Sequence, residues 1–298
     1  MYDVVIIGAG PAGLSAGIYA CRGGLKVAII ENKSVGGQAQ TAADIQNYPG
    51  IKSTSGFDLC YAMMNQCMEF GAEFVFDSIT SVSLIDETKA IGLASGKVVE
   101  AKNVIIASGA NARKLGVPSE SKFIGKGVSY CATCDGAFFK GKTVAVIGGG
   151  NTAAEDALYL EKLAKKVYMV HRRDSLRADD ILVKRLEKSN VEIVWDSVVE
   201  NLGGEDKITQ LTLKNVKTNA LTTISVDGVF VAIGQTPNSQ GFENISLSSG
   251  GYIIADENMH TNIDGVYAVG DVRKKSLRQV VTACADGAIA ANAIVNGI

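Results

Sequence analysis

Two copies of one glycine-rich pattern, the first beginning at Gly8 and the second at Gly148, constrain the fold of this chain more than any other feature. The first copy follows an apolar strand, Val4–Ile7, and reads Gly8-Ala9-Gly10-Pro11-Ala12-Gly13. A helix is predicted from about Pro11 to Arg22, and a second strand from Lys26 to Ile30. This order is typical of a βαβ unit that binds a dinucleotide at the helix N-terminus. Glu31 ends the second strand, where a carboxylate would hold ribose hydroxyls.

The second copy begins with the apolar strand Thr143–Ile147 and reads Gly148-Gly149-Gly150-Asn151-Thr152-Ala153. A helix is predicted from there to about Leu163, and another strand from Val167 to Val170. The repeated order predicts a second dinucleotide site. Two nucleotide-binding units agree with the two domains expected for 298 residues.

The two copies differ at the position that reads the ribose. His171 has the same offset from Gly148 as Glu31 has from Gly8, so the acid of the first copy is missing. The sequence there is His171-Arg172-Arg173, with Arg177 shortly after. A carboxylate would repel a 2′-phosphate, whereas guanidinium groups bind phosphate oxygens bidentately. We therefore predict one nucleotide read by an acid and one read by arginines; the alternative is a basic surface loop.

The strands around the two copies repeat as well. After each copy come antiparallel strands, predicted at 73–99 and 192–226. Each set is followed by an apolar strand that ends in small residues, at 104–110 and 228–234. The whole order of elements therefore occurs twice.

The C-terminal part has no second half of its own. It contains a predicted strand at 265–271 and a helix at about 279–295, which we expect to complete the first unit. The predicted fold is α/β, with two Rossmann-like three-layer ββα dinucleotide-binding domains. Residues 1–113 and 241–298 are expected to form the first domain, and residues 114–240 the second, inserted into the first.

Between the two copies lies Cys131-Ala132-Thr133-Cys134, followed by Asp135. Two thiols separated by two residues can close a small disulfide ring and reopen it, which stores two electrons. Asp135 stands where a proton donor or acceptor is needed, although it could simply be a turn residue before Gly136. Half of a zinc site is the other reading of the thiols, but neither His171 nor His260 has suitable company, so no metal is expected.

Composition limits the class of protein. The net charge is −2 and the pI about 5.8, so no nucleic-acid partner is expected. We expect no leader peptide and no membrane span, because the chain enters its first strand at once and has no apolar run long enough to cross a bilayer. Six cysteines are too few for a disulfide scaffold, and Cys21, Cys60, Cys67 and Cys284 are expected to be packing residues. A cytoplasmic location fits best.

Taken together, these motifs resemble the low-molecular-weight bacterial thioredoxin reductases over essentially the whole chain. The matching segments are Gly8–Gly13, Gly36-Gly37-Gln38, Cys131–Gly136, Gly148–Ala153, His171–Arg173 with Arg177-Ala178, Gly270-Asp271 and Arg278-Gln279. The resemblance implies an NADPH-dependent thioredoxin-disulfide reductase that is a homodimer, with FAD in the first domain, NADPH in the inserted one and thioredoxin as the partner.

The resemblance also assigns residues. Cys134 would be the thiol nearer the flavin, Cys131 would attack the partner, and Asp135 would be the acid/base. Asp271 would hold the ribityl chain, and the helix start at Gln279 and Val280 would face the pyrimidine side of the flavin. The residues assigned to FAD are Gly8, Gly10, Pro11, Ala12, Gly13, Glu31, Gly37, Gln38, Asn47, Gly109, Asp271, Arg278, Gln279 and Val280. The residues assigned to NADPH are Gly148, Gly150, Asn151, Thr152, Ala153, His171, Arg172, Arg173 and Arg177.

The chain departs from the commonest pattern of these reductases in two places beside the flavin, at Ala39-Gln40 and Leu277, and in one place after the cysteines, at Ala137. Relatives that take electrons from ferredoxin or serve a peroxide-reducing or other thioredoxin-like partner are the alternatives. Since one flavin face must serve both cysteines and nicotinamide, the linkers at 111–116 and 235–241 are expected to be hinges.

Overall fold

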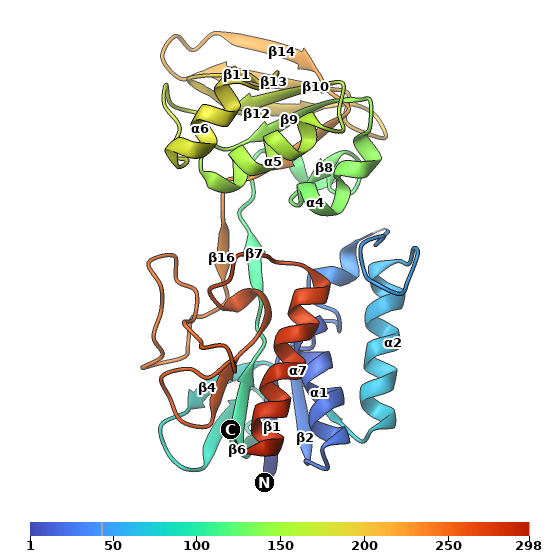
Figure 1. Ribbon diagram of the computed structural model, residues 1–298, viewed down its shortest axis with the longest axis vertical. Coiled ribbons are helices and arrows are strands. Elements are labelled where there is room, and N and C mark those ends of the chain that lie inside the picture. The colour runs from blue at the N-terminus through green and yellow to red at the C-terminus, as the bar shows by residue number, and fades with distance from the viewer. Residues whose placement is uncertain (43, 298) are drawn as a thin grey trace. The chain divides into compact units, whose positions relative to one another are not determined.

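The chain crosses twice between two units, each built on its own parallel sheet (Figure 1). The computed structural model describes residues 1–42 and 44–297. Met1–Asn111 and Thr236–Ile298 form the first unit, and Ala112–Gln235 the second. The crossing strands β7 (Ala110–Ala112) and β16 (Gln235–Pro237) pair with each other.

The second crossing lies earlier than the sequence suggested, after residue 235 rather than 240. The reason is Asn238, which belongs to the first unit. Its backbone N–H donates to Gly109 O (2.9 Å) and its side-chain Nδ2 to Ser108 O (2.8 Å). The first crossing lies after Asn111, two residues before the expected boundary.

Among the residues that the structure describes, the first unit has a seven-stranded sheet and three long helices. Its strands are β1 (Tyr2–Ile7), β2 (Val27–Glu31), β3 (Glu73–Phe76), β4 (Ile79–Ser83), β5 (Lys89–Leu93), β6 (Val98–Ile106) and β17 (Val266–Ala268). Its helices are α1 (Pro11–Arg22), α2 (Gly56–Glu69) and α7 (Val280–Asn296), with 3₁₀ turns η1 (Ala39–Thr41) and η3 (Gly270–Val272). Strands β3-β2-β1-β6-β17 are parallel, and β4 and β5 extend β6 in antiparallel fashion. The C-terminal strand thus completes the sheet that the N-terminus begins.

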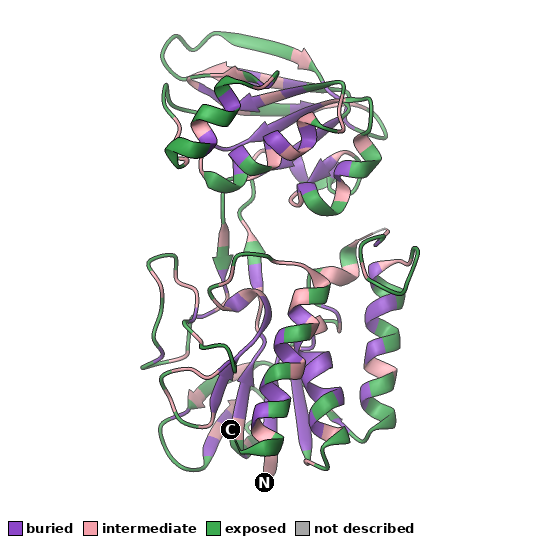
Figure 2. Cartoon of the chain, viewed as in Figure 1, coloured by how far each residue is buried: buried purple, intermediate pink, exposed green. Residues whose placement is uncertain are grey.

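Strand β1 shows why the first unit has three layers. Its side chains alternate between the two faces of the sheet, as a strand requires. Val4 and Ile6 pack with the helices, and Val5 and Ile7 pack against the antiparallel strands. All four are buried, which explains the continuous apolar run in the sequence (Figure 2). Helix α7 lies directly on α1 at Gly287, where an added methyl would overlap the backbone of α1.

The second unit repeats this plan. Its parallel sheet has the order β11-β10-β9-β15-β8, and an antiparallel sheet has the order β12-β13-β14. The strands are β8 (Val128–Ser129), β9 (Thr143–Ile147), β10 (Lys166–Val170), β11 (Glu192–Val194), β12 (Ser197–Gly203), β13 (Gln210–Asn215), β14 (Leu221–Ser225) and β15 (Gly228–Val231). The helices are α3 (Glu120–Phe123), α4 (Ala132–Asp135), α5 (Asn151–Glu161) and α6 (Asp180–Glu187), with the 3₁₀ turn η2 (Gly136–Phe139).

Strand β9 has the same alternation as β1. Val144 and Val146 face a core formed with α5 and α6, and Ala145 and Ile147 face the antiparallel sheet. The predicted fold class, two three-layer ββα units with the second inserted, is confirmed.

No helix in residues 1–42 and 44–297 is long and apolar enough to span a membrane.

Candidate functional site

The first glycine loop joins β1 to α1 with little room for side chains. Gly8 has φ +106°, and a methyl group there would lie 2.5 Å from Ala107 O. A methyl at Gly13 would overlap Gly8 O, so the helix can approach the strand only because this residue is glycine. Gly10 differs, since nothing lies within 4 Å of its missing side chain. Pro11 then starts α1, which leaves free N–H groups and the positive dipole end facing this open side.

Glu31 ends β2 beside this loop. One carboxylate oxygen accepts a hydrogen bond from Ala9 N (2.9 Å), and the other accepts from Lys33 N (2.9 Å). The acid is therefore fixed next to the glycine turn, with its remaining lone pairs available to ribose hydroxyls.

Three further segments converge on the first unit's loop. A methyl at Gly37 (φ +54°) would lie 3.6 Å from Gly10 Cα, and Gln38 Nε2 donates to Ala110 O. Asn47 Nδ2 donates to Gln279 Oε1 (3.0 Å), which joins this region to the start of α7. Gln279 and Thr282 form a capping box there, so Val280 begins the helix.

Asp271 indicates most clearly which chemical group this loop could hold. Its Oδ1 is buried and has no hydrogen-bond partner among the described residues. Burial raises the pKa of Asp271, and the positive charges of Lys275 and Arg278 offset this rise only in part. A buried carboxylate oxygen left unpaired is costly, so a hydroxyl donor is expected beside it. A polyol chain such as that of FAD would supply this donor, and the residues present fit the cofactor in this respect.

Arg278 has a second orphaned atom. Its Nε is buried without a partner among the described residues, and its guanidinium carbon lies 4.3 Å from the centre of the Tyr252 ring. The preceding residue, Leu277, is exposed and contributes its backbone oxygen, which accepts from Thr282 Oγ1 (3.0 Å).

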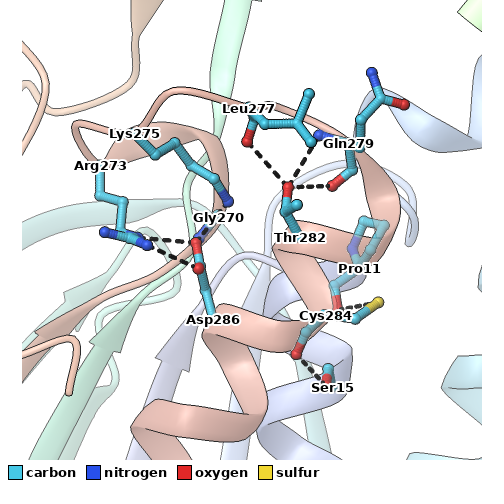
Figure 3. A network of polar contacts seen from close by, with 10 residues as sticks. All are labelled: Pro11, Ser15, Gly270, Arg273, Lys275, Leu277, Gln279, Thr282, Cys284 and Asp286. Carbon is cyan, nitrogen blue, oxygen red and sulfur yellow. Dashed lines mark hydrogen bonds and ion pairs between the residues drawn. The ribbon is translucent and has the colours of Figure 1, made fainter. Parts of the chain in front are cut away.

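The loop that holds Asp271 is fastened by a residue that sequence reasoning missed, Asp286 of α7 (Figure 3). Its carboxylate accepts from Gly270 N (3.0 Å) and Lys275 Nζ (2.7 Å), and doubly from Arg273 (2.9 Å for each bond). Asp286 itself is 4% exposed. Burial alone raises the pKa of Asp286, but the hydrogen bonds from Arg273 and Lys275 outweigh it and lower the pKa overall. An acid inside an Ala-rich helix gave no sign of this role in the sequence.

Replacing Asp286 with asparagine is expected to destabilise the first unit by about 3–5 kcal/mol, because Arg273 and Lys275 would lose their carboxylate inside the protein. The free energy of unfolding is measured in urea, with the release of bound flavin as the signal. Glu192→Gln is the control, since its pair with Lys166 (2.9 Å) is exposed and is worth less than about 1 kcal/mol.

The pH dependence follows from the lowered pKa of Asp286. The contribution is fully present above the unfolded value of about 3.9 and is lost as the pH falls through the lower folded value. Equal stabilities of wild type and Asp286→Asn at neutral pH would contradict the role of this network.

The second glycine loop joins β9 to α5 and is closed by His171. A methyl at Gly148 would overlap Ala232 O, and one at Gly149 would overlap the His171 ring. His171 is buried (5% exposed), and its Nε2 has no partner among the described residues. Burial lowers the pKa of His171, and the neighbouring arginines lower it further. This histidine therefore packs neutral behind the loop.

The arginines that follow His171 in the sequence differ from it in exposure. Arg172, Arg173 and Arg177 are exposed, and no ion pair involves their side chains in the part of the chain that the structure describes. Arg177 N donates to Gly149 O (2.7 Å), which brings this segment onto the glycine loop. Asn151, at the start of α5, exchanges two hydrogen bonds with Asp179 (2.8 Å each). Exposed guanidinium groups on a segment that is hydrogen-bonded to the glycine loop could bind a phosphate.

Cys131 and Cys134 form a disulfide at the short helix α4. Cys131 caps that helix, because its sulfur accepts from Cys134 N (3.2 Å). Cys134 is exposed and Cys131 is partly buried. The ring can therefore exchange with an external thiol.

Ser129 connects Asp135 to this disulfide, and sequence reasoning did not identify it. Its hydroxyl donates to Asp135 Oδ2 (2.5 Å) and accepts from Cys131 N (3.1 Å). Burial raises the pKa of Asp135, and the Ser129 bond offsets this only in part. Asp135 is therefore held next to the disulfide ring. It keeps its proton to a higher pH than an ordinary aspartate does. The place of Ser129 two positions before the first cysteine was the only signal available.

Among the described residues, no group of three or more His, Cys, Asp or Glu side chains could hold a metal ion. The parts present are two dinucleotide-type loops on separate parallel sheets and a disulfide beside a half-buried acid. They define a nucleotide-dependent disulfide oxidoreductase. Residues 2–287 match the family described as pyridine nucleotide-disulphide oxidoreductase, and the chain belongs to this family.

Curated and solved relatives carry the comparison further. The chain is 44% identical over 299 residues to a thioredoxin reductase of Treponema pallidum, covering 100% of this chain and 97% of the relative. It is 47% identical to a thioredoxin reductase of Peptoclostridium acidaminophilum, covering 98% and 95%. The crystal structure of thioredoxin reductase from Streptococcus pyogenes matches with a TM-score of 0.94 at 44% identity, covering 99% of this chain and 97% of that one. The predicted resemblance is confirmed.

Proposed function

We propose that this chain is a thioredoxin-disulfide reductase that passes electrons from NADPH through FAD and the Cys131–Cys134 disulfide to a disulfide of thioredoxin. Thioredoxin reductases of this family use FAD and NADPH. The observation that carries the proposal is the disulfide beside the half-buried Asp135, in the same unit as a glycine loop followed by three exposed arginines.

FAD, when bound, accepts a hydride equivalent from NADPH and supplies two electrons to a disulfide. Its binding falls to the first unit. Glu31 would hold ribose hydroxyls, the N-terminus of α1 would hold the pyrophosphate, and Asp271 would accept from the ribityl chain. The start of α7 at Gln279 and Val280 would face the pyrimidine side of the flavin, where the positive end of the helix dipole would stabilise negative charge. The other residues assigned to FAD are Gly8, Gly10, Pro11, Ala12, Gly13, Gly37, Gln38, Asn47, Gly109 and Arg278.

The second unit holds NADPH through the loop that starts α5. Arg172, Arg173 and Arg177 would bind the 2′-phosphate, because their charges are exposed and form no ion pair with a carboxylate of the described residues. His171 acts behind them, filling the space that Gly149 leaves. The other residues assigned to NADPH are Gly148, Gly150, Asn151, Thr152 and Ala153.

The thiol chemistry then needs only Cys131, Cys134 and Asp135. Two electrons break the Cys131–Cys134 bond and leave two sulfurs that take up protons. The Cys131 thiolate attacks the partner disulfide, forms a mixed disulfide and releases one partner thiolate. The Cys134 thiolate attacks Cys131, which releases the second partner thiolate and restores the ring. Asp135, with its raised pKa, donates and recovers the proton at the leaving sulfur.

Asp135→Asn is expected to slow thioredoxin reduction by about a hundredfold or more, since a positioned acid contributes about 10²–10⁴. The amide keeps the Ser129 contact but carries no transferable proton. Stopped-flow measurement of mixed-disulfide resolution between pH 5 and 9 checks this. The ratio of the wild-type rate to the variant rate is expected to fall as the pH rises past the pKa of the acid, because the Cys134 thiol titrates in both proteins and only wild type has the acid. Identical pH profiles would remove Asp135 from the mechanism.

The function is tested by following NADPH oxidation with a panel of thioredoxins and glutaredoxins, and with NADH in place of NADPH. Turnover with at least one thioredoxin and NADPH supports the proposal. Flavin bleaching by NADPH without reduction of any protein disulfide would refute it. Efficient reduction by ferredoxin instead of NADPH would favour the alternative donor.

Two further properties belong to this proposal. We infer a homodimer, because apolar side chains are exposed along the first unit's helices: Tyr19 on α1, Phe57 and Tyr61 on α2, and Ile289 and Val295 on α7. We also infer a cytoplasmic location, because the four remaining thiols, free in the structure, persist in a reducing compartment.

A further inference from the structure

A buried carboxylate joins the segment that follows the first crossing of the chain to the segment that carries the disulfide. Glu120 is 3% exposed and accepts from Leu115 N (2.8 Å) and Gly116 N (3.0 Å), one bond to each oxygen. The oxygen bound to Leu115 also accepts from the hydroxyl of Tyr130 (2.6 Å). Leu115 lies two residues after Arg113, whose N–H donates to Gly234 O in the returning crossing (3.0 Å). Tyr130 directly precedes Cys131.

The helix that carries Glu120 is anchored in the second unit. This helix, α3, is anchored by Phe123, which is 1% exposed in the core between the two sheets of the second unit. The preceding residue, Ser119, donates to Asn201 Oδ1 (2.8 Å) and accepts from Leu202 N (3.1 Å). A carboxylate with three donors in such a place costs little to keep buried, whereas losing a donor leaves it underpaired.

Tyr130 connects Glu120 to the segment that carries the disulfide. Burial raises the pKa of Tyr130, and the bond to Glu120 raises it further, so the hydroxyl keeps its proton and stays a donor. Its neighbour Ser129 holds Cys131 N, and the sulfur of Cys131 caps α4. A shift of Cys131 when the ring opens therefore reaches Tyr130 through one peptide bond.

We propose that Glu120 is a positioning residue that couples the start of the second unit, at Leu115 and Gly116, to the disulfide segment 129–135 through Tyr130. The inference rests on the proposed function only for its kinetic consequence. Coupling between two sites is reciprocal. The redox state of Cys131–Cys134 therefore alters the conformation of the segment at Leu115 and Gly116, and the conformation of that segment alters the reactivity of the thiols. Through this contact, the redox state of the disulfide reaches the segment that directly follows the first crossing.

Amide hydrogen exchange of the flavin-loaded enzyme tests the coupling directly. The disulfide form is compared with the dithiol form, which is prepared with dithiothreitol and needs no NADPH. In wild type, reduction is expected to change the exchange rates of Leu115 and Gly116 by about threefold or more. In Tyr130→Phe this redox dependence is expected to disappear, while both amides stay bonded to Glu120. Equal rates in the two redox forms of wild type would overturn the proposal, as would an undiminished difference in Tyr130→Phe.

The chain offers a matched control in Tyr2→Phe. Tyr2 also donates to a glutamate, Glu73 (2.6 Å), but lies in the first unit at the start of β1. This variant is expected to keep the wild-type redox difference. Glu120→Gln is the second test of the coupling, because its amide can accept only one of the two backbone bonds. It is expected to speed exchange at Leu115 or Gly116 in both redox forms and to abolish the redox difference; a retained difference would count against Glu120.

The kinetic arm separates this inference from the proposed function. Tyr130→Phe is expected to lower turnover with thioredoxin by about tenfold, the effect of one lost charge-assisted hydrogen bond, and to leave flavin reduction by NADPH unchanged. Equal slowing of both half-reactions would indicate general damage and refute a positioning role. If wild type itself reduces no protein disulfide, the proposed function fails, but the exchange experiment still decides whether the coupling exists.

Discussion

Serine in place of Cys134 is expected to abolish NADPH-driven reduction of thioredoxin, by at least about a thousandfold, because the ring that stores two electrons can no longer form. Flavin reduction by NADPH should persist, since neither glycine loop nor Asp271 is touched. Anaerobic flavin bleaching and insulin-coupled thioredoxin turnover measure the two steps separately.

The same substitution tests the direction given to each sulfur. With Cys134 absent, the Cys131 thiolate can still attack the partner disulfide, but no second thiol resolves the mixed disulfide, which should accumulate on a non-reducing gel. Cys131→Ser should accumulate far less. Cys21→Ser is the control, because Cys21 is a free thiol on α1 that has no part in the exchange. Trapping through Cys134 in the Cys131→Ser variant would reverse the assignment, and thioredoxin turnover by Cys134→Ser would refute the mechanism.

The elements that the sequence predicted best are those whose signals are local. Helix α1 has the predicted bounds Pro11–Arg22, because glycines, a proline at the first helical position and Gly23 mark its two ends. Strand β9 likewise has its predicted bounds, since a strand buried on both faces is a continuous apolar run. The C-terminal strand β17 also joined the sheet expected for it, because a lone strand–helix pair cannot bury its own core.

The contacts that the sequence did not reveal connect residues through tertiary structure. Asp286 and Glu120 carried no signal in the sequence, yet each is buried and accepts hydrogen bonds from residues outside its own helix. His171 was predicted with the phosphate-binding residues because it occupies the position of Glu31. In the structure its ring fills the space behind Gly149, so it differs from its arginine neighbours in burial and charge.

Those arginines carry the last prediction. Arg172→Ala with Arg173→Ala is expected to raise the KM for NADPH by about a hundredfold, the loss of two charge-assisted bonds of about 1.5 kcal/mol each. The KM for NADH and the kcat with either nucleotide should change little, because NADH lacks the 2′-phosphate. Steady-state kinetics with both nucleotides at two salt concentrations measure this, since salt screens an exposed clamp.

The control is Lys184→Ala with Arg185→Ala on α6, which removes the same charge from the same unit away from the glycine loop. It should leave the preference for NADPH over NADH intact. An equal rise in KM for NADPH and NADH in the Arg172/Arg173 variant would mean that the loop itself had been disturbed. An unchanged ratio of the two constants would mean that these guanidinium groups do not read the phosphate, and the second nucleotide would then have to be recognised through Arg177 and the start of α5 alone.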